Sequence, residues 1–351
     1  MPLETTVIGA YPKPPYTPVT DWFQQPEGGD DSAPTTRYVQ EMAAAGEAAE
    51  ALLQRAAREV IDDQVLAGID VVTDGEVRRE NYIHYHCRHL DGIDFENLTE
   101  KALRNGAYSA LLPTIRSPIK VRDSGFLAHD WKTAQAATER PVKVTIPGPM
   151  TISDTTADAH YDDPARRGRD LAEAVNVEVR ALAEAGCRYI QVDEPLFARK
   201  PQEALDYGIE NLERCFHGVP EGVARVMHMC CGYPDHLDRE DYPKADPQAY
   251  FQLAEAVDSI AIDEVSIEDA HRPNDLSLLE SYKKTRVILG VVAIAKSRVE
   301  TVDELQDRLR QALGHIDAER LVAAPDCGLG LLGRDLAYRK LCNLSAAAQG
   351  C

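Results

Sequence analysis

The sequence contains no run of 18 or more apolar residues, the length that a helix needs to cross a bilayer. It is also short of positive charge, with 38 Lys and Arg against 58 Asp and Glu and a formal net charge of −20. A strongly acidic chain repels nucleic acid and anionic membrane surfaces. We therefore expect neither a nucleic acid nor a membrane as partner.

The start of the chain has neither the basic residues nor the long apolar core of a signal peptide. Its eight cysteines are scattered, and none form the paired Cys-x2–4-Cys knuckle that is typical of structural zinc sites. Scattered cysteines without a secretory signal favour reduced thiols over a disulfide framework. We expect a cytoplasmic protein.

The 351 residues suit either two domains or one large barrel, and 44% hydrophobic residues are enough for a sizeable core. Short apolar runs alternate with segments of helical periodicity, which predicts a parallel sheet. Strands are expected at 5–10, 68–73, 141–146, 189–192, 224–228, 259–268, 287–292 and 321–324, and helices at 36–67, 128–138, 165–185, 203–215, 247–256, 275–284, 302–315 and 334–347.

Eight strand–helix units are the number in a (β/α)8 barrel. We therefore predict an α/β fold of this type, a TIM barrel, as a single catalytic domain over residues 1–351. A hairpin excursion is expected after the second strand, within 88–140. A doubly wound sheet is the alternative, but no Gly-x-Gly-x-x-Gly motif follows the first strand.

The most informative stretch is Arg225-Val-Met-His-Met-Cys-Cys231. On a strand, residues two apart share a side, so His228 and Cys230 can face one point while Cys231 faces away. An imidazole and a thiolate on one side form half of a zinc site. Cys327, after another apolar run, can add a second thiolate. Buried cysteines of structural role are the alternative interpretation.

Polar residues follow the predicted strands at their carboxyl ends. In a barrel these ends meet at one face, where active sites lie. Soft thiolate ligands select zinc over magnesium or calcium, and a carboxylate would complete a tetrahedral site. The residues at these positions are Glu76, Asp193, Glu194, His228, Cys230, Glu268 and Cys327.

The chain resembles the catalytic barrel of cobalamin-independent methionine synthase, in the superfamily of uroporphyrinogen decarboxylase-like barrels. The matching stretches cover nearly the whole chain in the family's order. They are Thr6-Val-Ile-Gly-Ala-Tyr-Pro12, Asp74-Gly-Glu76, Gly148-Pro-Met-Thr151, Gln191-Val-Asp-Glu-Pro195, His228-Met-Cys230, Val265-Ser-Ile-Glu268 and Pro325-Asp-Cys-Gly328.

The resemblance implies a zinc-dependent thiol S-methyltransferase, similar to 5-methyltetrahydropteroyltriglutamate–homocysteine S-methyltransferase, that methylates a zinc-bound thiolate such as that of homocysteine. The implied zinc ligands are His228, Cys230, Glu268 and Cys327, with Asp263 and Glu264 as competitors for the carboxylate position. Glu76 and Asp193 would hold the amino group of the thiol substrate. Partners would be the thiol and a methyl or alkyl donor, and the chain could form a homo-oligomer.

Four departures from the family concern the donor. Ala10 replaces a serine near the amino-acid carboxylate, and Ala295 stands where the family has a histidine thought to protonate the leaving group. Residues 153–163 lack the family's aromatic folate-contacting pattern, and the long form's N-terminal barrel is not expected. These differences favour a donor other than methyltetrahydrofolate, with His271 as an alternative proton donor.

Three other functions remain open. The first is a zinc-dependent alkyltransferase of the epoxyalkane:coenzyme M transferase type, in which Arg79 could bind a sulfonate. The second is a decarboxylase of the wider superfamily, which needs no zinc. The third is a zinc-binding protein without catalysis.

Overall fold

The computed structural model describes residues 2–24, 33–103, 108–232, 236–240, 242 and 244–351. Its main sheet has eight parallel strands, in the order β1-β11-β10-β9-β8-β7-β5-β2. Their bounds are β1 (Glu4–Thr5), β2 (Val72–Thr73), β5 (Val142–Pro147), β7 (Tyr189–Asp193), β8 (Ala224–Met229), β9 (Glu264–Glu268), β10 (Arg286–Val292) and β11 (Leu321–Pro325). A parallel bridge between Thr6 and Val71 joins the two edges and closes the sheet. The predicted (β/α)8 barrel is confirmed.

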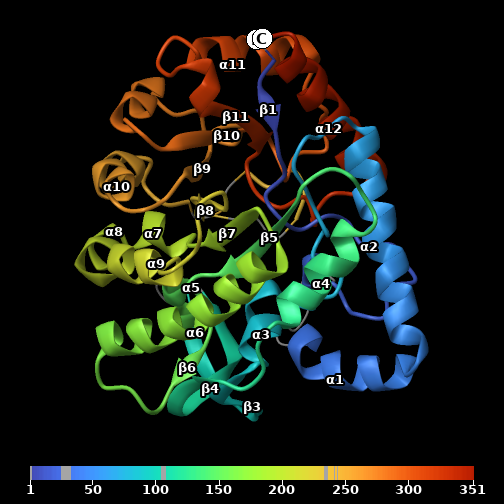
Figure 1. The fold of residues 1–351 in the computed structure, drawn as a ribbon, viewed down its shortest axis with the longest axis vertical. Helices are drawn as coiled ribbons and strands as arrows, with labels where there is room; N and C mark the ends of the chain where they lie inside the picture. The colour runs from blue at the N-terminus through green and yellow to red at the C-terminus, as the bar shows by residue number, and fades with distance from the viewer. Residues whose placement is uncertain (1, 25–32, 104–107, 233–235, 241, 243) are drawn as a thin grey trace.

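Helices surround this barrel (Figure 1). The α-helices are α1 (Ala33–Ala45), α2 (Ala48–Leu66), α3 (Tyr82–Cys87), α4 (Phe126–Gln135), α5 (Pro149–Asp154), α6 (Pro164–Ala185), α7 (Leu196–Arg199), α8 (Pro201–Glu203), α9 (Ile209–Cys215), α10 (Gln248–Ser259), α11 (Val302–Ala312) and α12 (Arg334–Gln349). Short 3-10 turns lie at Trp22–Gln24, Leu276–Ser281 and Ala318–Arg320, and a π-helical turn lies at Ala204–Gly208. No helix in the described ranges is long and apolar enough to traverse a bilayer.

Local sequence signals explain where α6 begins and ends. The Asp163 carboxylate accepts a hydrogen bond from the first turn, and Pro164 occupies the first helical position, where its missing N–H costs nothing. Gly186 ends the helix in the left-handed region, at φ 106°. Between these ends, residues such as Leu171, Val175 and Val179 are buried at helical spacing, so one face of α6 packs on the core.

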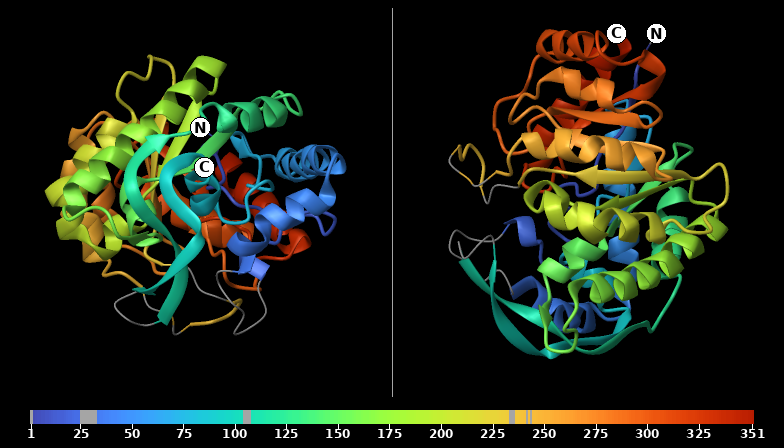
Figure 2. Two further views of the ribbon diagram at one scale, coloured as in Figure 1. Left: turned by 90° about the horizontal axis from the view of Figure 1, so that it is seen from below. Right: turned by 90° about the vertical axis from the view of Figure 1, so that its left-hand side faces the viewer.

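A long antiparallel hairpin leaves the barrel between β2 and β5. It consists of β3 (Leu90–Leu103) and β4 (Tyr108–Val121), and the short strand β6 (Ala157–Asp158) pairs with β4 in parallel. Figure 2 shows the hairpin at the end of the molecule away from the two chain termini. The predicted hairpin excursion after the second strand is therefore confirmed.

Two predicted elements were wrong. Residues 259–262 are not a strand, because α10 continues to Ser259 and β9 begins only at Glu264. Ile260 and Ile262 are both buried, although neither is in a strand. Alternating apolar residues therefore cannot distinguish a strand from a buried segment that follows a helix. The helix expected at 275–284 is a 3-10 turn instead.

Inside the barrel, a small apolar cluster and the buried Lys143 lie below the polar carboxyl ends of the strands. Ile8, Val226, Ile288, Val322 and Ala324 form a small cluster separate from the main core. Because Val226 and His228 are two residues apart on β8, they face the same side, and this apolar cluster lies one layer below the polar carboxyl ends. It forms the floor of the candidate site.

Candidate metal centre and active site

The register of the strands brings the predicted site residues to one level. Asp193 on β7 pairs with His228 on β8, and His228 pairs with Ser266 on β9. Glu268, the last residue of β9, pairs with Gly290 on β10. The carboxyl ends of these strands therefore lie side by side, as the barrel prediction requires.

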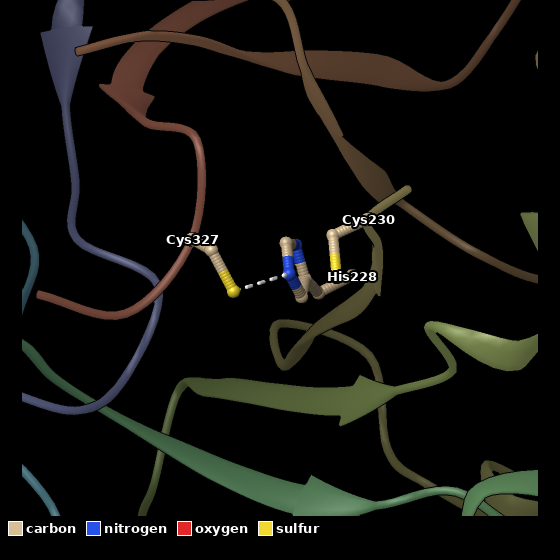
Figure 3. A group of neighbouring side chains, drawn as sticks. All are labelled: His228, Cys230 and Cys327. Carbon is tan, nitrogen blue, oxygen red and sulfur yellow. Dashed lines mark hydrogen bonds between the residues drawn. The ribbon is translucent and has the colours of Figure 1, made fainter. Parts of the chain in front are cut away.

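Three of the four predicted metal ligands meet there. One ligand atom from each of His228, Cys230 and Cys327 lies within 4.8 Å of the other two, and Cys327 Sγ is 3.4 Å from His228 Nε2. Figure 3 shows the three side chains converging from the end of β8 and the chain after β11. Cys231 is outside this group, since it is fully buried in the main hydrophobic core. One nitrogen and two sulfurs in this arrangement match the donor set of a zinc site.

Neighbouring polar groups hold two of these side chains in place. His228 Nδ1 lies 2.9 Å from Ser266 Oγ, which leaves Nε2 directed at the sulfurs. The Asp326 carboxylate accepts hydrogen bonds from the backbone N–H groups of residues 269–271, at 2.7–2.9 Å. This contact ties the chain at Cys327 to the loop that follows Glu268. Such outer contacts typically orient metal ligands.

Hydrogen bonds and charges couple the protonation of the three side chains. The hydrogen bond from Cys327 lowers the pKa of Cys230 well below its usual value, whereas the same contact raises the pKa of Cys327 well above it. Burial lowers the pKa of His228, but the hydrogen bond and charge of Cys230 outweigh burial and raise it. A metal ion held by these side chains would compete with their protons.

Glu268 lies at the end of β9 but is held away from the three ligands. Its Oε1 accepts a hydrogen bond from Lys244 Nζ at 2.9 Å, and its Oε2 accepts one from the backbone N–H of Cys231 at 3.0 Å. Burial raises the pKa of Glu268. Both carboxylate oxygens are therefore occupied by other donors in this structure.

The two competing carboxylates lie at the opposite end of the barrel. Asp263 precedes β9 and binds the backbone N–H and Nε of Arg225, both at 2.8 Å. Glu264 is the first residue of β9 and pairs with Arg286. At about 3.3 Å per residue, the two ends of this strand are roughly 13 Å apart. Of the three, Glu268 alone lies at the level of the cluster.

Glu76 occupies a constrained position beside the barrel mouth. Its φ is 57°, a left-handed value that non-glycine residues rarely adopt. The carboxylate accepts a hydrogen bond from Thr145 Oγ1 at 2.6 Å, and a Cβ on Gly9 would lie 2.6 Å from its Oε1. Burial raises its pKa. Strain of this kind concentrates at functional sites, where surrounding contacts enforce it.

Asp193 is the second predicted substrate-binding carboxylate. Gln191 Nε2 donates to its Oδ1 at 2.7 Å and also to the carbonyl oxygen of Ile8. Burial raises the pKa of Asp193 to about 7, although the nearby charge of His228 opposes this increase. Glu76 contributes further to the increase. The two carboxylates are therefore close enough to interact and together suit one cationic group.

Ala10, which the family resemblance places near the carboxylate of the amino-acid substrate, lies against the segment that follows Cys327. Its carbonyl oxygen accepts a hydrogen bond from the backbone N–H of Leu329 at 2.7 Å, and a Cβ on Gly328 would lie 3.1 Å from the Ala10 Cβ. The Ala10 methyl group offers no hydrogen bond at this corner of the site.

Two residues singled out from the sequence have structural roles. The buried Glu194 carboxylate accepts hydrogen bonds from the backbone N–H groups of Met150 and Thr151, which fixes the start of α5. Arg79 is 3% exposed and donates to the backbone oxygen and Oγ1 of Thr145 at 2.9 Å. Arg79 is therefore not available to bind a sulfonate at the surface of the mouth.

Two residues near the site were missed by the sequence interpretation. Tyr82 begins α3, and burial together with the charges of Asp193 and Cys230 raises its pKa. Lys244, which binds Glu268, lies in the long connection after β8 and belongs to no periodic pattern. The only sequence signal for Tyr82 was its position just after the polar loop 74–81.

Comparison with known proteins identifies similar chains. A family model described as the cobalamin-independent synthase catalytic domain matches residues 3–350. Methionine synthase from Saccharolobus solfataricus is 30% identical over 346 residues, covering 97% of this chain and 92% of that protein. Methionine synthase from Pyrococcus abyssi is 29% identical over 351 residues, covering 99% and 92%. The structure of a B12-independent methionine synthase from Shewanella sp. W3-18-1 in complex with selenomethionine aligns with a TM-score of 0.86 and 30% identity, covering 99% of this chain and 97% of that one.

Proposed function

Because the chain belongs to the family of cobalamin-independent synthase catalytic domains, we propose that it is a zinc-dependent methyltransferase acting on the thiol of homocysteine. The observation that carries this proposal is the convergence of His228, Cys230 and Cys327 within 4.8 Å at the barrel mouth. Their soft donor set fits zinc. A zinc ion held there would lower the pKa of the acceptor thiol and keep it as a thiolate at neutral pH.

We assign Glu268 as the fourth ligand. It lies at the level of the cluster, and its competitors Asp263 and Glu264 lie at the other end of β9. To bind a metal, its carboxylate would leave Lys244. As the hardest of the four donors, it is also the one that a soft thiolate would displace most readily. In this proposal Lys244 receives the displaced carboxylate.

Glu76 and Asp193 would hold the ammonium group of homocysteine. Both carboxylates are buried, and among the described residues their one ion-pair partner is Arg79, 3.7 Å from Glu76, which leaves one of the two negative charges unpaired. A bound ammonium would supply the missing charge. It would also fix the acceptor so that its sulfur points at the cluster.

In the transfer step, the acceptor sulfur attacks the methyl carbon and forms a C–S bond, while the bond from that carbon to the donor breaks with its electron pair. A folate nitrogen needs a proton to leave. The family's proton donor is replaced by Ala295, and His271 Nε2 instead accepts the backbone N–H groups of Ile294 and Ala295 at 3.1 and 3.2 Å. Burial, with nearby lysines, lowers the pKa of His271 to about 3.

Neutral His271 with an occupied Nε2 is a poor acid, which supports a donor whose leaving group departs unprotonated. A methylated corrinoid, a sulfonium and a strained ether are donors of this kind. The epoxyalkane:coenzyme M type of reaction also fits the cluster, but the burial of Arg79 removes the observation that favoured a sulfonate. A decarboxylase would leave the metal cluster unexplained.

The test combines metal content with transfer. Purified protein should retain about one zinc per chain, and removing it with a chelator should abolish thiol-dependent transfer. Monoglutamyl methyltetrahydrofolate should give weak or no methylation of homocysteine, and a methylated corrinoid or sulfonium should give more. Turnover with the folate near the enzyme median of roughly 10 s⁻¹ would refute the donor assignment.

A further inference from the structure

The regular pairing of β8 with β9 ends just before two of the proposed metal ligands. The last pair in the register of these strands is Met229 with Ile267. Cys230 and Glu268 come next in the chain, so the ladder between the two strands does not fix their relative positions. Buried backbone groups are rarely left unpaired, and other donors and acceptors must therefore hold these strand ends.

One tyrosine hydroxyl joins the two strand ends. Tyr250 belongs to α10 and is fully buried, with 0% of its surface exposed. Its hydroxyl donates a hydrogen bond to the carbonyl oxygen of Met229 at 3.1 Å and accepts one from the backbone N–H of Glu268 at 3.3 Å. The hydroxyl therefore connects the residue next to Cys230 with Glu268 itself, at the point where the ladder stops.

The carbonyl group of Glu268 is held as well. Asn274 Nδ2 donates to the Glu268 carbonyl oxygen at 2.6 Å and to Asp269 Oδ1 at 3.2 Å. Asp269 is bound in turn by Arg308, whose Nε and Nη2 lie 2.6 and 2.8 Å from its two carboxylate oxygens. This bidentate ion pair fixes Asp269 and, through it, the side chain of Asn274. Both backbone groups of Glu268 consequently have well-fixed partners.

The carboxylate of Glu268 has a more mobile kind of partner. Its Oε1 is bound by Lys244, which lies in the connection between β8 and α10 and has a flexible four-carbon stem. Its Oε2 accepts the backbone N–H of Cys231. The contacts thus divide Glu268 into a fixed main chain and an exchangeable carboxylate.

We propose that Tyr250 and Asn274 are positioning residues that fix the main chain of Glu268, so that its carboxylate passes between Lys244 and the metal by side-chain rotation alone. This inference rests on the proposed function, because it requires a metal at the cluster. Tyr250 has a second effect, since through Met229 it also holds the segment that carries Cys230.

A fixed main chain favours metal binding for a simple reason. If the end of β9 were free, Glu268 would have to lose backbone freedom each time that it bound the metal, and this entropy cost would lower the affinity. Tyr250 and Asn274 bear that cost when the protein folds. Outer contacts of this kind typically change metal affinity or activity 10–100-fold when they are removed.

Competition for zinc against a chromophoric chelator, on the full chain, tests the proposal. Tyr250→Phe and Asn274→Ala should each weaken zinc binding about 10–100-fold. Tyr161→Phe is the matched control, because its hydroxyl also accepts a backbone N–H, from Ile119 on the hairpin strand β4, and donates to the carboxylate of Asp170. The control should lower the melting temperature and leave the zinc affinity unchanged.

Two further readouts would not respond to a loss of stability alone. The visible spectrum of the cobalt(II)-loaded chain reports the geometry of the bound metal, and it should change in Tyr250→Phe but not in Tyr161→Phe. A double-mutant cycle tests the route of the effect. In Glu268→Ala, Asn274→Ala should have no further effect on zinc affinity, whereas Tyr250→Phe should keep the part that acts through Cys230.

Two results would overturn the proposal: parental zinc affinity and cobalt spectrum in both variants, or an effect of Asn274→Ala that persists undiminished in Glu268→Ala. If Tyr250→Phe does not fold, Asn274→Ala and its cycle with Glu268→Ala carry the same test. Failure of both variants to fold would show that the two residues serve the fold, and would also overturn it. A parent chain that binds no zinc would contradict the proposed function itself, whereas a zinc-binding parent with unaffected variants would contradict this inference alone.

Discussion

Replacing Lys244 with methionine should make zinc bind more tightly. The Lys244 and Glu268 side chains are 14% and 3% exposed, and their polar atoms are 2.9 Å apart, so the contact is a partly buried, charge-assisted hydrogen bond. Such a bond contributes about 1.5–3 kcal/mol. If Glu268 is to bind zinc, it must first give up this bond, and the variant removes that cost. Taking the lower value, the dissociation constant for zinc should fall about tenfold.

The measurement is a competition for zinc against a chromophoric chelator, in mildly alkaline buffer because burial raises the pKa of Glu268. Thiol binding should change in the opposite direction, because the displaced carboxylate loses its acceptor, so the KM for the thiol should rise. Lys244→Arg should behave like the parent. Lys200→Met is a matched control, because it removes a nearby lysine that is paired with Asp154 and not with Glu268. An unchanged or weaker zinc affinity in Lys244→Met, with normal folding, would refute the exchange of Glu268 between Lys244 and the metal.

Three further predictions concern the same site. Cys230→Ser or Cys327→Ser should abolish zinc retention measured by metal analysis, whereas Cys231→Ser should retain zinc because Cys231 packs in the main core; the reverse pattern would mean that our assignment of ligands is wrong. Ser266→Ala should weaken zinc binding roughly 10–100-fold by freeing the His228 ring, and an unchanged affinity would show that the 2.9 Å contact does not orient it. Because the raised pKa of Asp193 is about 7, its carboxylate is ionised above and protonated below that pH, so homocysteine should bind more weakly as the pH falls through 7; titration calorimetry should show this dependence lost in Asp193→Asn.

The sequence predicted the barrel well because both of its periodicities are strong. Strands such as β10 and β11 are buried on both faces and therefore appear as continuous apolar runs, and α6 has clear signals at both ends. The spacing of His228 and Cys230 predicted their shared direction from strand geometry alone. Cys327 needed the further assumption that the strands close into a barrel, because 99 residues separate it from His228.

The parts that could not be predicted depend on contacts without local pattern. The family resemblance favoured Glu268 over Asp263 and Glu264, but strand periodicity alone could not, because the choice depends on where β9 begins. Lys244 lies in a connection with no periodicity, and its role appears only through its bond to Glu268. Glu194 looked like a site residue because it follows Asp193, but it faces the start of α5 and not the cluster.

The separation of the metal ligands along the chain has a consequence for biosynthesis. At about 5–20 residues per second, translation of the 99 residues between His228 and Cys327 takes roughly 5–20 s. During that interval Cys230 has been made but the second sulfur does not yet exist, so the nascent chain offers only half of the donor set. Stable metal loading should therefore follow the emergence of β11, late in synthesis. In the proposed function, a cell that makes this protein during zinc shortage would accumulate chains in which Cys230 and Cys327 have no metal to protect them against oxidation.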